Sequence, residues 1–200
     1  MQNRVTHSAR GSGGLRIIGG RYRGRKLPVP TQPGLRPTAD RVRETLFNWL
    51  QPVIAGARCL DLFAGSGALG FEAASRGASE VLLIEHSESV IRVLAANART
   101  LGTSRVKVRR AEALHWLSGS AEPFDIVFLD PPFDKNQLGP SCNLLSGKGW
   151  LAPRALVYLE APLNRAFVAL PSDWSLIRDK QAGQVRFALA AVHKSGAAIF

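Results

Sequence analysis

The chain has 200 residues, of which 46% are hydrophobic and 20% charged, a composition typical of one globular domain. We find no apolar run near the ~18 residues that a membrane span needs, and the polar N-terminus lacks the apolar region of a secretory signal. Cys59 and Cys142 are far apart and the four histidines are scattered, so neither a disulfide framework nor a metal site is predicted. Membrane and secreted proteins are thereby excluded, and a cytoplasmic protein is expected.

Positive charge is concentrated in the N-terminal fifth of the chain. Residues 1–44 contain ten Lys or Arg residues against only Asp40 and Glu44, a net charge of +8 out of the chain's total of +11. Nine of the ten are arginines, whose planar guanidinium suits phosphate and stacks on bases. A nucleic acid partner is therefore predicted, with a solubilising tail as the alternative. The candidate contact residues are Arg21, Arg23, Arg25, Lys26, Arg36, Arg41 and Arg43.

Short extended runs and prolines organise the first 37 residues. Residues 15–18 and 21–23 flank Gly19-Gly20, and a Gly-Gly pair between strand-like runs predicts a small β-hairpin. Four prolines between residues 28 and 37 then mark an extended linker. We therefore divide the chain into a basic arm, residues 1–37, and a main domain, residues 38–200.

Helical and strand patterns alternate from Thr38 onward. A first helix is predicted from Thr38 to Leu50, with Arg41, Arg43 and Glu44 off its apolar face. A clearer amphipathic helix covers residues 87–101. Strands are predicted where short runs are mostly apolar, at residues 59–63, 81–85, 106–109, 125–129 and 156–159. Apolar strands that alternate with helices imply a parallel sheet covered on both faces. Near the end of the chain, residues 174–180 and 185–192 flank a turn and predict an antiparallel hairpin.

A glycine-rich turn follows the first strand of the main domain. Asp61 precedes Gly65-x-Gly67-x-x-Gly70, a spacing that lets the backbone pass close to a nucleotide-like ligand where a helix begins. Glu85 ends the next strand, a position from which a carboxylate binds ribose hydroxyls. The Asp61 carboxylate would repel a pyrophosphate but suits the ammonium and sulfonium cations of S-adenosylmethionine. S-adenosylmethionine is therefore predicted as cofactor in preference to a dinucleotide, with no metal.

A second motif, Asp130-Pro131-Pro132-Phe133, follows the apolar strand at residues 125–129. An exocyclic base amine is a poor nucleophile because its lone pair is delocalised into the ring. A carboxylate and a loop carbonyl can accept its two N–H bonds and favour a pyramidal nitrogen, while an aromatic ring stacks on a base held out of its helix. The motif therefore predicts methyl transfer to a base amine; the alternative is a rigid loop set by consecutive prolines.

These motifs, together with residues 15–20 and the block from Leu35 to Leu50, resemble a known family. The chain resembles the class I S-adenosylmethionine-dependent methyltransferases, and among them the bacterial 16S ribosomal RNA (guanine-N2)-methyltransferases of the RsmD type, which modify guanine 966 of the small subunit. The resemblance covers almost the whole chain. It implies an α/β, Rossmann-like fold: a mixed, mostly parallel seven-stranded sheet with helices on both faces, an antiparallel C-terminal hairpin and a small N-terminal β-hairpin.

The resemblance also implies roles for individual residues. The methionine part of the cofactor would lie among Asp61, Phe63, Ala64, Gly65 and Gly67. The cofactor ribose would contact Glu85, and its adenine would lie beside His86, Glu112 and Ala113. The target guanine would be held by Asp130, Pro131 and Phe133. The partner would be 16S rRNA in the small ribosomal subunit, reached through the basic arm by a monomeric protein.

Three other functions fit parts of the sequence. A DNA or RNA adenine-N6 methyltransferase, or a DNA cytosine-N4 enzyme, also uses a [D/N]PP-aromatic loop. Reading a DNA sequence, however, takes groove-binding elements that the ~40 residues before the main domain do not supply. A nicotinamide-dependent dehydrogenase would need a proton-transfer residue in a substrate domain, and the sequence offers none. A non-catalytic RNA-binding module would not need the loop from Asp130 to Phe133.

Overall fold

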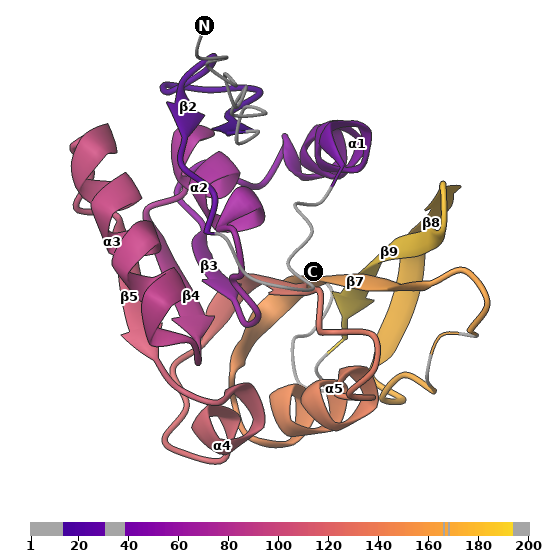
Figure 1. The fold of residues 1–200 in the computed structure, drawn as a ribbon. Coiled ribbons are helices and arrows are strands. Elements are labelled where there is room, and N and C mark those ends of the chain that lie inside the picture. Colours follow the sequence, from indigo (N-terminus) through magenta and orange to yellow (C-terminus); the bar gives the residue numbers. More distant parts are fainter. Residues whose placement is uncertain (1–13, 31–38, 166, 168, 194–200) are drawn as a thin grey trace, which may run out of the picture.

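The computed structural model describes residues 14–30, 39–165, 167 and 169–193. Its centre is a seven-stranded sheet in the order β5-β4-β3-β6-β7-β9-β8 (Figure 1). In chain order its strands are β3 (Arg58–Asp61), β4 (Glu80–Glu85), β5 (Val106–Arg110), β6 (Phe124–Leu129), β7 (Leu151–Pro162), β8 (Trp174–Ala182) and β9 (Val185–Val192). Strands β3 to β7 run parallel, whereas β9 is antiparallel to both β7 and β8. The predicted mixed, mostly parallel sheet with a C-terminal hairpin is confirmed.

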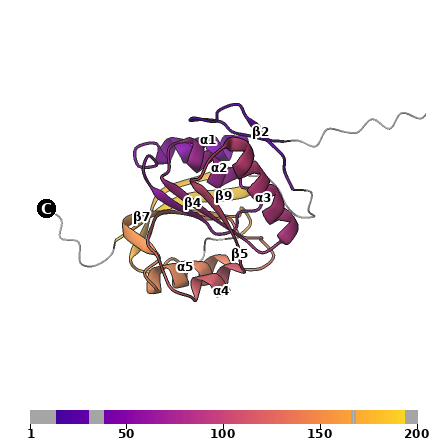
Figure 2. The ribbon, with the colours of Figure 1, turned by 90° about the vertical axis from the view of Figure 1, so that its left-hand side faces the viewer.

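Helices cover both faces of this sheet, as the alternating pattern predicts. The described helices are α1 (Asp40–Leu50), α2 (Ala68–Ser75), α3 (Glu88–Leu101), α4 (Ala113–Leu117) and α5 (Leu138–Gly147). Helices α1, α2 and α3 lie over one face, and α4 and α5 lie over the other (Figures 1 and 2). None of the helices within the described ranges is long and apolar enough to cross a bilayer.

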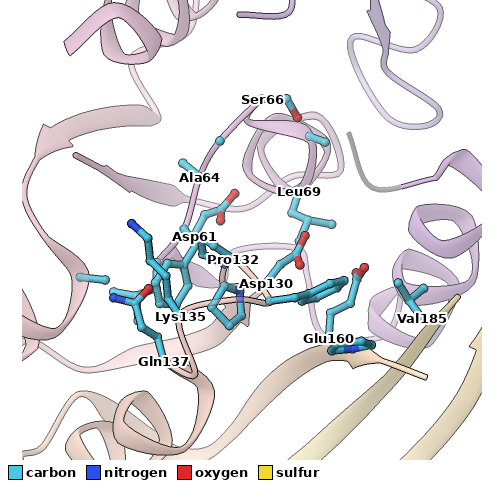
Figure 3. A pocket seen from close by; sticks show the side chains of 18 of the residues that line it. Asp61, Ala64, Ser66, Leu69, Asp130, Pro132, Lys135, Gln137, Glu160 and Val185 are labelled. Carbon is cyan, nitrogen blue, oxygen red and sulfur yellow. The ribbon is translucent and has the colours of Figure 1, made fainter. Parts of the chain in front are cut away.

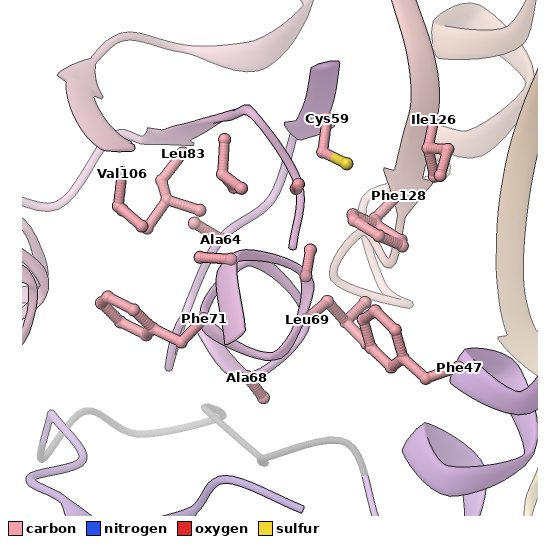
Figure 4. Packing of buried hydrophobic residues seen from close by; sticks show 14 of the residues in the cluster. Phe47, Cys59, Ala64, Ala68, Leu69, Phe71, Leu83, Val106, Ile126 and Phe128 are labelled. Atoms are coloured by element: carbon pink, nitrogen blue, oxygen red, sulfur yellow. The ribbon is translucent and has the colours of Figure 1, made fainter. Parts of the chain in front are cut away.

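Two hydrophobic clusters follow from this layering, because successive side chains of a strand point to opposite faces. The cluster under α1, α2 and α3 contains Phe71 on α2, with Leu83 and Val106 nearby, and Phe128 on β6, which packs against Phe47 (Figure 4). The cluster under α4 and α5 takes the alternate strand positions, among them Val127 and Leu129. The inner strands are thus apolar on both faces, which is why their sequences read as continuous apolar runs.

The C-terminal hairpin has the predicted strands with a tighter turn. Ala182 pairs with Val185, so only Gly183 and Gln184 connect β8 to β9. Gly183 has a φ of +59°, a left-handed conformation that glycine adopts without steric cost. Strand β7 extends beyond the predicted residues 156–159 at both ends, because Leu151 pairs with Phe124 on β6 and pairing with β9 continues through to Pro162.

The N-terminal hairpin exists, but its predicted second strand was wrong. Strand β1 (Leu15–Arg16) pairs with β2 (Lys26–Leu27), not with residues 21–23. Gly19-Gly20 is not the turn, since the carboxylate of Glu72 on α2 accepts hydrogen bonds from the backbone N–H groups of Ile18 and Gly19, each at 2.8 Å. A Cβ at Gly20 would lie 1.9 Å from the carbonyl oxygen of Ser75, so only glycine permits this approach to α2.

The hairpin packs on the main body of the protein. Leu15, Ile17, Tyr22 and Leu27 are buried in the same hydrophobic cluster as α1 and α2. Thr38, the predicted start of α1, lies outside the described residues, and so does the boundary between residues 37 and 38. The division into an arm and a main domain therefore stays a prediction.

Candidate active site

The carboxyl ends of β3, β4, β6 and β7 open into one cavity of about 1640 Å³ (Figure 3). This is the edge at which parallel α/β sheets bind ligands. The cavity brings together the predicted site residues Asp61, Phe63, Ala64, Gly65, Glu85, His86, Glu112, Ala113, Asp130, Pro131 and Phe133. Gly67 does not line it. Instead Gly67 is the N-cap of α2, with a φ of +76°, and a Cβ there would lie within 2.7 Å of Phe71 and Leu94.

Two carboxylates hold the glycine-rich loop. Asp61, at the end of β3, is buried, and its Oδ2 accepts a hydrogen bond from the backbone N–H of Gly70 at 3.1 Å. Glu85, at the end of β4, accepts from the N–H of Gly65 through Oε2 at 3.1 Å. Its other oxygen accepts from the N–H groups of His86 and Ser87. Both acids sit where the neighbouring strands end, as the spacing of the two motifs predicts.

The electrostatics of Asp61 favour a cationic ligand. Burial raises the pKa of Asp61 to about 7; the hydrogen bond from Gly70 opposes that rise, and the charge of Glu85 adds to it. Within the described ranges no basic side chain forms an ion pair with Asp61. A buried carboxylate in this position is stabilised when an opposite charge enters the cavity beside it.

The third predicted carboxylate has a structural partner on each oxygen. Glu112 is the N-cap of α4, where its Oε2 accepts from the N–H of His115 at 2.8 Å. Its Oε1 accepts from the side-chain amide of Gln137 at 3.1 Å, which ties the start of α5 to the start of α4. The imidazole Nδ1 of His86 lies 3.0 Å from Oε1 of Glu85, and its ring is exposed at the cavity.

The loop from Asp130 to Phe133 leaves β6 directly into the cavity. Phe133 is 37% exposed, so part of its ring is available for contact. One guanidinium nitrogen of Arg165 donates to the Phe133 carbonyl oxygen and to the Asn136 side chain, both at 2.7 Å. Arg165 thus pins the loop from the segment that follows β7, a contact between residues 32 positions apart that the sequence did not reveal.

One cavity residue, Glu160 on β7, was missed by the sequence analysis. Leu129 on β6 pairs with Leu159 on β7, so Asp130 and Glu160 come next on two neighbouring parallel strands. Oε2 of Glu160 accepts the hydroxyl proton of Tyr158 at 2.6 Å. Burial raises the pKa of Glu160, against the opposing effect of that hydrogen bond. The available signal was a carboxylate at the end of the apolar run Leu156–Leu159, as Asp130 ends the run before it.

Comparisons with known proteins identify the family of this chain. The family described as Conserved hypothetical protein 95 matches residues 15–191. Ribosomal RNA small subunit methyltransferase D of Escherichia coli (strain K12) is 53% identical over 179 residues, which cover 90% of each chain. The protein of the same name from Haemophilus influenzae is 44% identical, with 94% of this chain and 98% of the relative covered. The chain belongs to the RsmD family. The solved structure of yhhF from Escherichia coli matches with a TM-score of 0.87 and 48% identity, covering 92% of this chain and all of that chain.

In this family member, the predicted RNA-contacting residues divide into two groups. Arg21, Arg23, Arg25 and Lys26, in the hairpin, and Arg41, on α1, have exposed side chains. Arg36 lies outside the described residues. The positive charges of the described hairpin and of Arg41 on α1 are therefore accessible to solvent.

The prediction for Arg43 was wrong, because its side chain is only 1% exposed. One guanidinium nitrogen bonds to the Asp40 carboxylate at 2.5 Å and to the Arg16 carbonyl oxygen at 3.1 Å. The other lies 3.8 Å from Oε2 of Glu72, which is fully buried. Arg43 is thus one of two cations beside the carboxylate that holds the arm, the other being Arg76 at 2.8 Å, and its guanidinium is not accessible at the surface.

The acidic residues of the cavity do not form a metal-binding group. Across the part of the chain that the structure describes, no three His, Cys, Asp or Glu side chains are placed to hold a metal ion.

Proposed function

We propose that this protein transfers a methyl group from S-adenosylmethionine to the N2 amine of guanine 966 in the 16S rRNA of the small ribosomal subunit. The observation that carries the proposal is that the loop from Asp130 to Phe133 shares one cavity with Asp61, Glu85 and the glycine-rich loop. A binding module or a dehydrogenase would not need both motifs together. The names of the two relatives, which describe ribosomal RNA small subunit methyltransferases, support the substrate class.

The described residues fit the proposed cofactor. Among the described residues the buried Asp61 carboxylate forms no ion pair with a basic side chain. It would face the ammonium of the methionine part, with Phe63, Ala64 and Gly65 beside it. The carboxylate of Glu85, at the next strand end, would accept from the ribose hydroxyls. His86, Glu112 and Ala113 line the cavity wall proposed for adenine. When bound, S-adenosylmethionine supplies an electrophilic methyl group.

The base-binding end of the proposal rests on the loop after β6. The carboxylate of Asp130 and the carbonyl of Pro131 would each accept one N–H bond of the target amine. Both acceptors favour a pyramidal nitrogen with its lone pair directed at the methyl group, and the charge of Asp130 offsets the positive charge that develops on nitrogen. The exposed part of the Phe133 ring would stack on the base, which requires the nucleotide to leave its helix. Arg165 keeps this loop in place.

The proposed RNA contacts involve the arm and α1. The exposed side chains of Arg21, Arg23, Arg25, Lys26 and Arg41 would contact rRNA phosphates, together with Arg36. The substrate presents its own folded shape, so a short basic arm is sufficient for docking. We further propose that the protein acts as a monomer in the cytoplasm, where ribosomal subunits are found.

The test uses labelled S-adenosylmethionine with unmodified small ribosomal subunits, naked 16S rRNA and DNA as separate substrates. The methylated nucleoside is then identified by digestion and mass spectrometry. We expect N2-methylguanosine from small subunits, at one position. If the product is N6-methyladenosine, the protein is instead an adenine-N6 methyltransferase. If DNA becomes labelled, it is a DNA methyltransferase.

A further inference from the structure

Glu160 lies beside Asp130 at the base-binding end of the cavity. Because Leu129 pairs with Leu159, the two acids leave adjacent parallel strands at the same level, and such strands are ~4.8 Å apart. Figure 3 shows the side chains of Asp130 and Glu160 both extending into the cavity. The charges of Glu160 and Asp130 both add to burial in raising the pKa of Tyr158, which indicates that the two carboxylates share one environment.

The surroundings of Glu160 leave its charge without a cation. Its side chain is only 6% exposed, and among the described residues no Lys, Arg or His forms an ion pair with it. Within the described part of the chain, this carboxylate accepts one hydrogen bond, a neutral one from the Tyr158 hydroxyl to Oε2. A buried carboxylate with one neutral hydrogen bond and no cation beside it costs free energy unless a further donor binds it. Because Glu160 lines the cavity, a bound molecule can bring that donor.

We propose that Glu160 selects guanine by accepting the N1–H of the target base while Asp130 accepts from the neighbouring N2 amine. The inference rests on the function proposed above and names a specificity-determining residue for it. On the Watson–Crick edge of guanine, N1–H and the N2 amine are adjacent donors. Two adjacent carboxylate acceptors match that pair.

The same two acceptors disfavour the other bases that carry an exocyclic amine. Next to the amine of adenine stands N1, and next to the amine of cytosine stands N3; both are acceptors with a lone pair. A carboxylate facing either lone pair is repelled and gains no hydrogen bond, so the buried charge stays unsatisfied. Glu160 therefore favours guanine over the two bases on which the alternative [D/N]PP-aromatic enzymes act.

Tyr158 would position the selecting group. Its hydroxyl holds Oε2 of Glu160 at 2.6 Å, which leaves Oε1 to accept from the base. Since Tyr158 and Glu160 are two residues apart on β7, their side chains point to the same face of the sheet. Tyr158 touches no base in this arrangement and acts only through Glu160.

The experiment compares two target bases with the wild-type protein and Glu160→Gln. Small subunits are reconstituted on 16S rRNA that carries guanine or 2-aminopurine at the target position. Both bases have the exocyclic amine, but N1 of 2-aminopurine is an acceptor. The measured quantity is the ratio of kcat/KM for guanine to kcat/KM for 2-aminopurine; the lost O6 affects both proteins alike and cancels between them. The glutamine amide can donate to N1, so we expect Glu160→Gln to lower the guanine preference by roughly ten- to a hundredfold.

Two further variants complete the design. Glu122→Gln is the matched control, because Glu122 is an exposed acid that pairs with Arg58 at the amino ends of the strands, away from the cavity. It should leave the ratio unchanged. Glu160→Asp keeps the charge on a shorter side chain, so it should react more slowly but still prefer guanine. Thermal melts identify the folded variants. If Glu160→Gln does not fold, the guanine preference of Glu160→Asp is the result that decides.

The outcomes separate this inference from the function on which it rests. A wild-type guanine preference that folded Glu160→Gln retains in full would overturn the role of Glu160 and leave guanine methylation standing. Loss of that preference in Glu160→Asp would also overturn it, because the acceptor charge is still present. Absence of N2-methylguanosine with the wild-type protein would instead refute the proposed function itself.

Discussion

Asp61 and Glu85 hold the same glycine-rich loop from two neighbouring strands. The Asp61 carboxylate accepts from the N–H of Gly70 and the Glu85 carboxylate from the N–H of Gly65, each at 3.1 Å. The two acids thus fix the backbone of the turn while their charges remain close enough for Glu85 to raise the pKa of Asp61. A cofactor with a cationic end relieves that repulsion, which makes binding sensitive to pH.

The affinity for S-adenosylmethionine should rise as the pH increases from 5.5 to 7.5. The pKa of Asp61 is raised from 3.8 to about 7 in the ligand-free protein, and the cationic ligand binds the ionised form. Below pH 7 the affinity should therefore fall by up to about tenfold per pH unit. Calorimetry at several pH values measures this, with Asp61→Asn as the comparison. The asparagine variant should bind more weakly but with a flatter pH profile; equal slopes for both proteins would contradict the assignment.

The raised pKa of Asp61 also predicts that the ligand-free fold loses stability as the pH rises, the opposite of the trend in cofactor affinity. A carboxyl group whose pKa is higher in the folded than in the unfolded state favours folding when it is protonated. The contribution of Asp61 is therefore fully present below about pH 4 and is lost as the pH rises through 7. In chemical denaturation of the ligand-free protein, Asp61→Asn should gain stability relative to the wild type as the pH rises from 5 to 8. A stability difference that stays constant over that range would show that the carboxyl group does not titrate there.

Substitutions of Asp130 should slow methyl transfer to different degrees. Asp130→Ala removes the charged acceptor for the amine and should lower the single-turnover rate by about 10²–10³-fold. Asp130→Asn keeps a neutral acceptor at nearly the same place, and because charge-assisted hydrogen bonds are roughly twice as strong as neutral ones, it should retain partial activity. Calorimetry with S-adenosylmethionine and a thermal melt serve as controls, since Asp130 follows β6 and lies outside both hydrophobic clusters. A folded Asp130→Ala protein with the wild-type rate would show that another residue accepts the hydrogen bond of the target amine.

Removal of the arm's exposed charge should weaken binding to small subunits and flatten its salt dependence. The test replaces Arg21, Arg23, Arg25 and Lys26 together by alanine. Each lost phosphate contact reduces the slope of log K against log salt by about 0.7–0.9. Binding is measured by filter retention between 50 and 300 mM salt. The matched control replaces Lys107 and Arg110 on β5, whose charges already pair with Glu80 and Glu88. If the arm variant has the wild-type slope, the arm does not contact phosphates and is instead a solubilising tail.

Arg43→Ala should destabilise the fold where Arg41→Ala does not. Arg43 is buried, where it bonds to Asp40 and lies 3.8 Å from Glu72. Glu72 keeps a second cation, Arg76, at 2.8 Å, so the loss of Arg43 should lower the free energy of unfolding by about 1.5–3 kcal/mol. Arg41 is exposed, so its replacement should change stability by less than about 0.5 kcal/mol. Denaturant unfolding of both variants measures the difference. Equal stabilities would show that the buried contacts of Arg43 do not stabilise the fold.

Much of the fold could be predicted from local pattern. The sheet strands were recognisable because burial on two faces demands continuous apolar runs, and β9 was predicted with the bounds that it has, Val185–Val192. The cofactor and base motifs were recognisable because each follows such a strand. Their meeting in one cavity followed from parallel strand order, which puts all the carboxyl ends at one edge.

The errors have one physical origin, a carboxylate distant in sequence. Glu72 is 54 positions from Ile18 and binds its N–H, which moved the hairpin turn away from Gly19-Gly20. Arg43 is buried between Asp40, the Arg16 carbonyl oxygen and this same acid, although helical periodicity treats every arginine as a surface residue. Glu160 was missed because a strand-end acid becomes informative only when the register beside Asp130 is known.

The arm is fastened to α2 mainly through main-chain atoms. Besides the two N–H groups that Glu72 binds, the N–H of Arg21 donates to the carbonyl oxygen of Ser75 at 2.7 Å, and the N–H of Tyr22 donates to its hydroxyl at 2.9 Å. The basic side chains of the hairpin therefore contribute little to its attachment to α2. Provided that Gly20 stays glycine, the outward charges can be replaced one by one without detaching the hairpin. Affinity for a polyanion and placement of the arm are thus separately adjustable properties of one short segment.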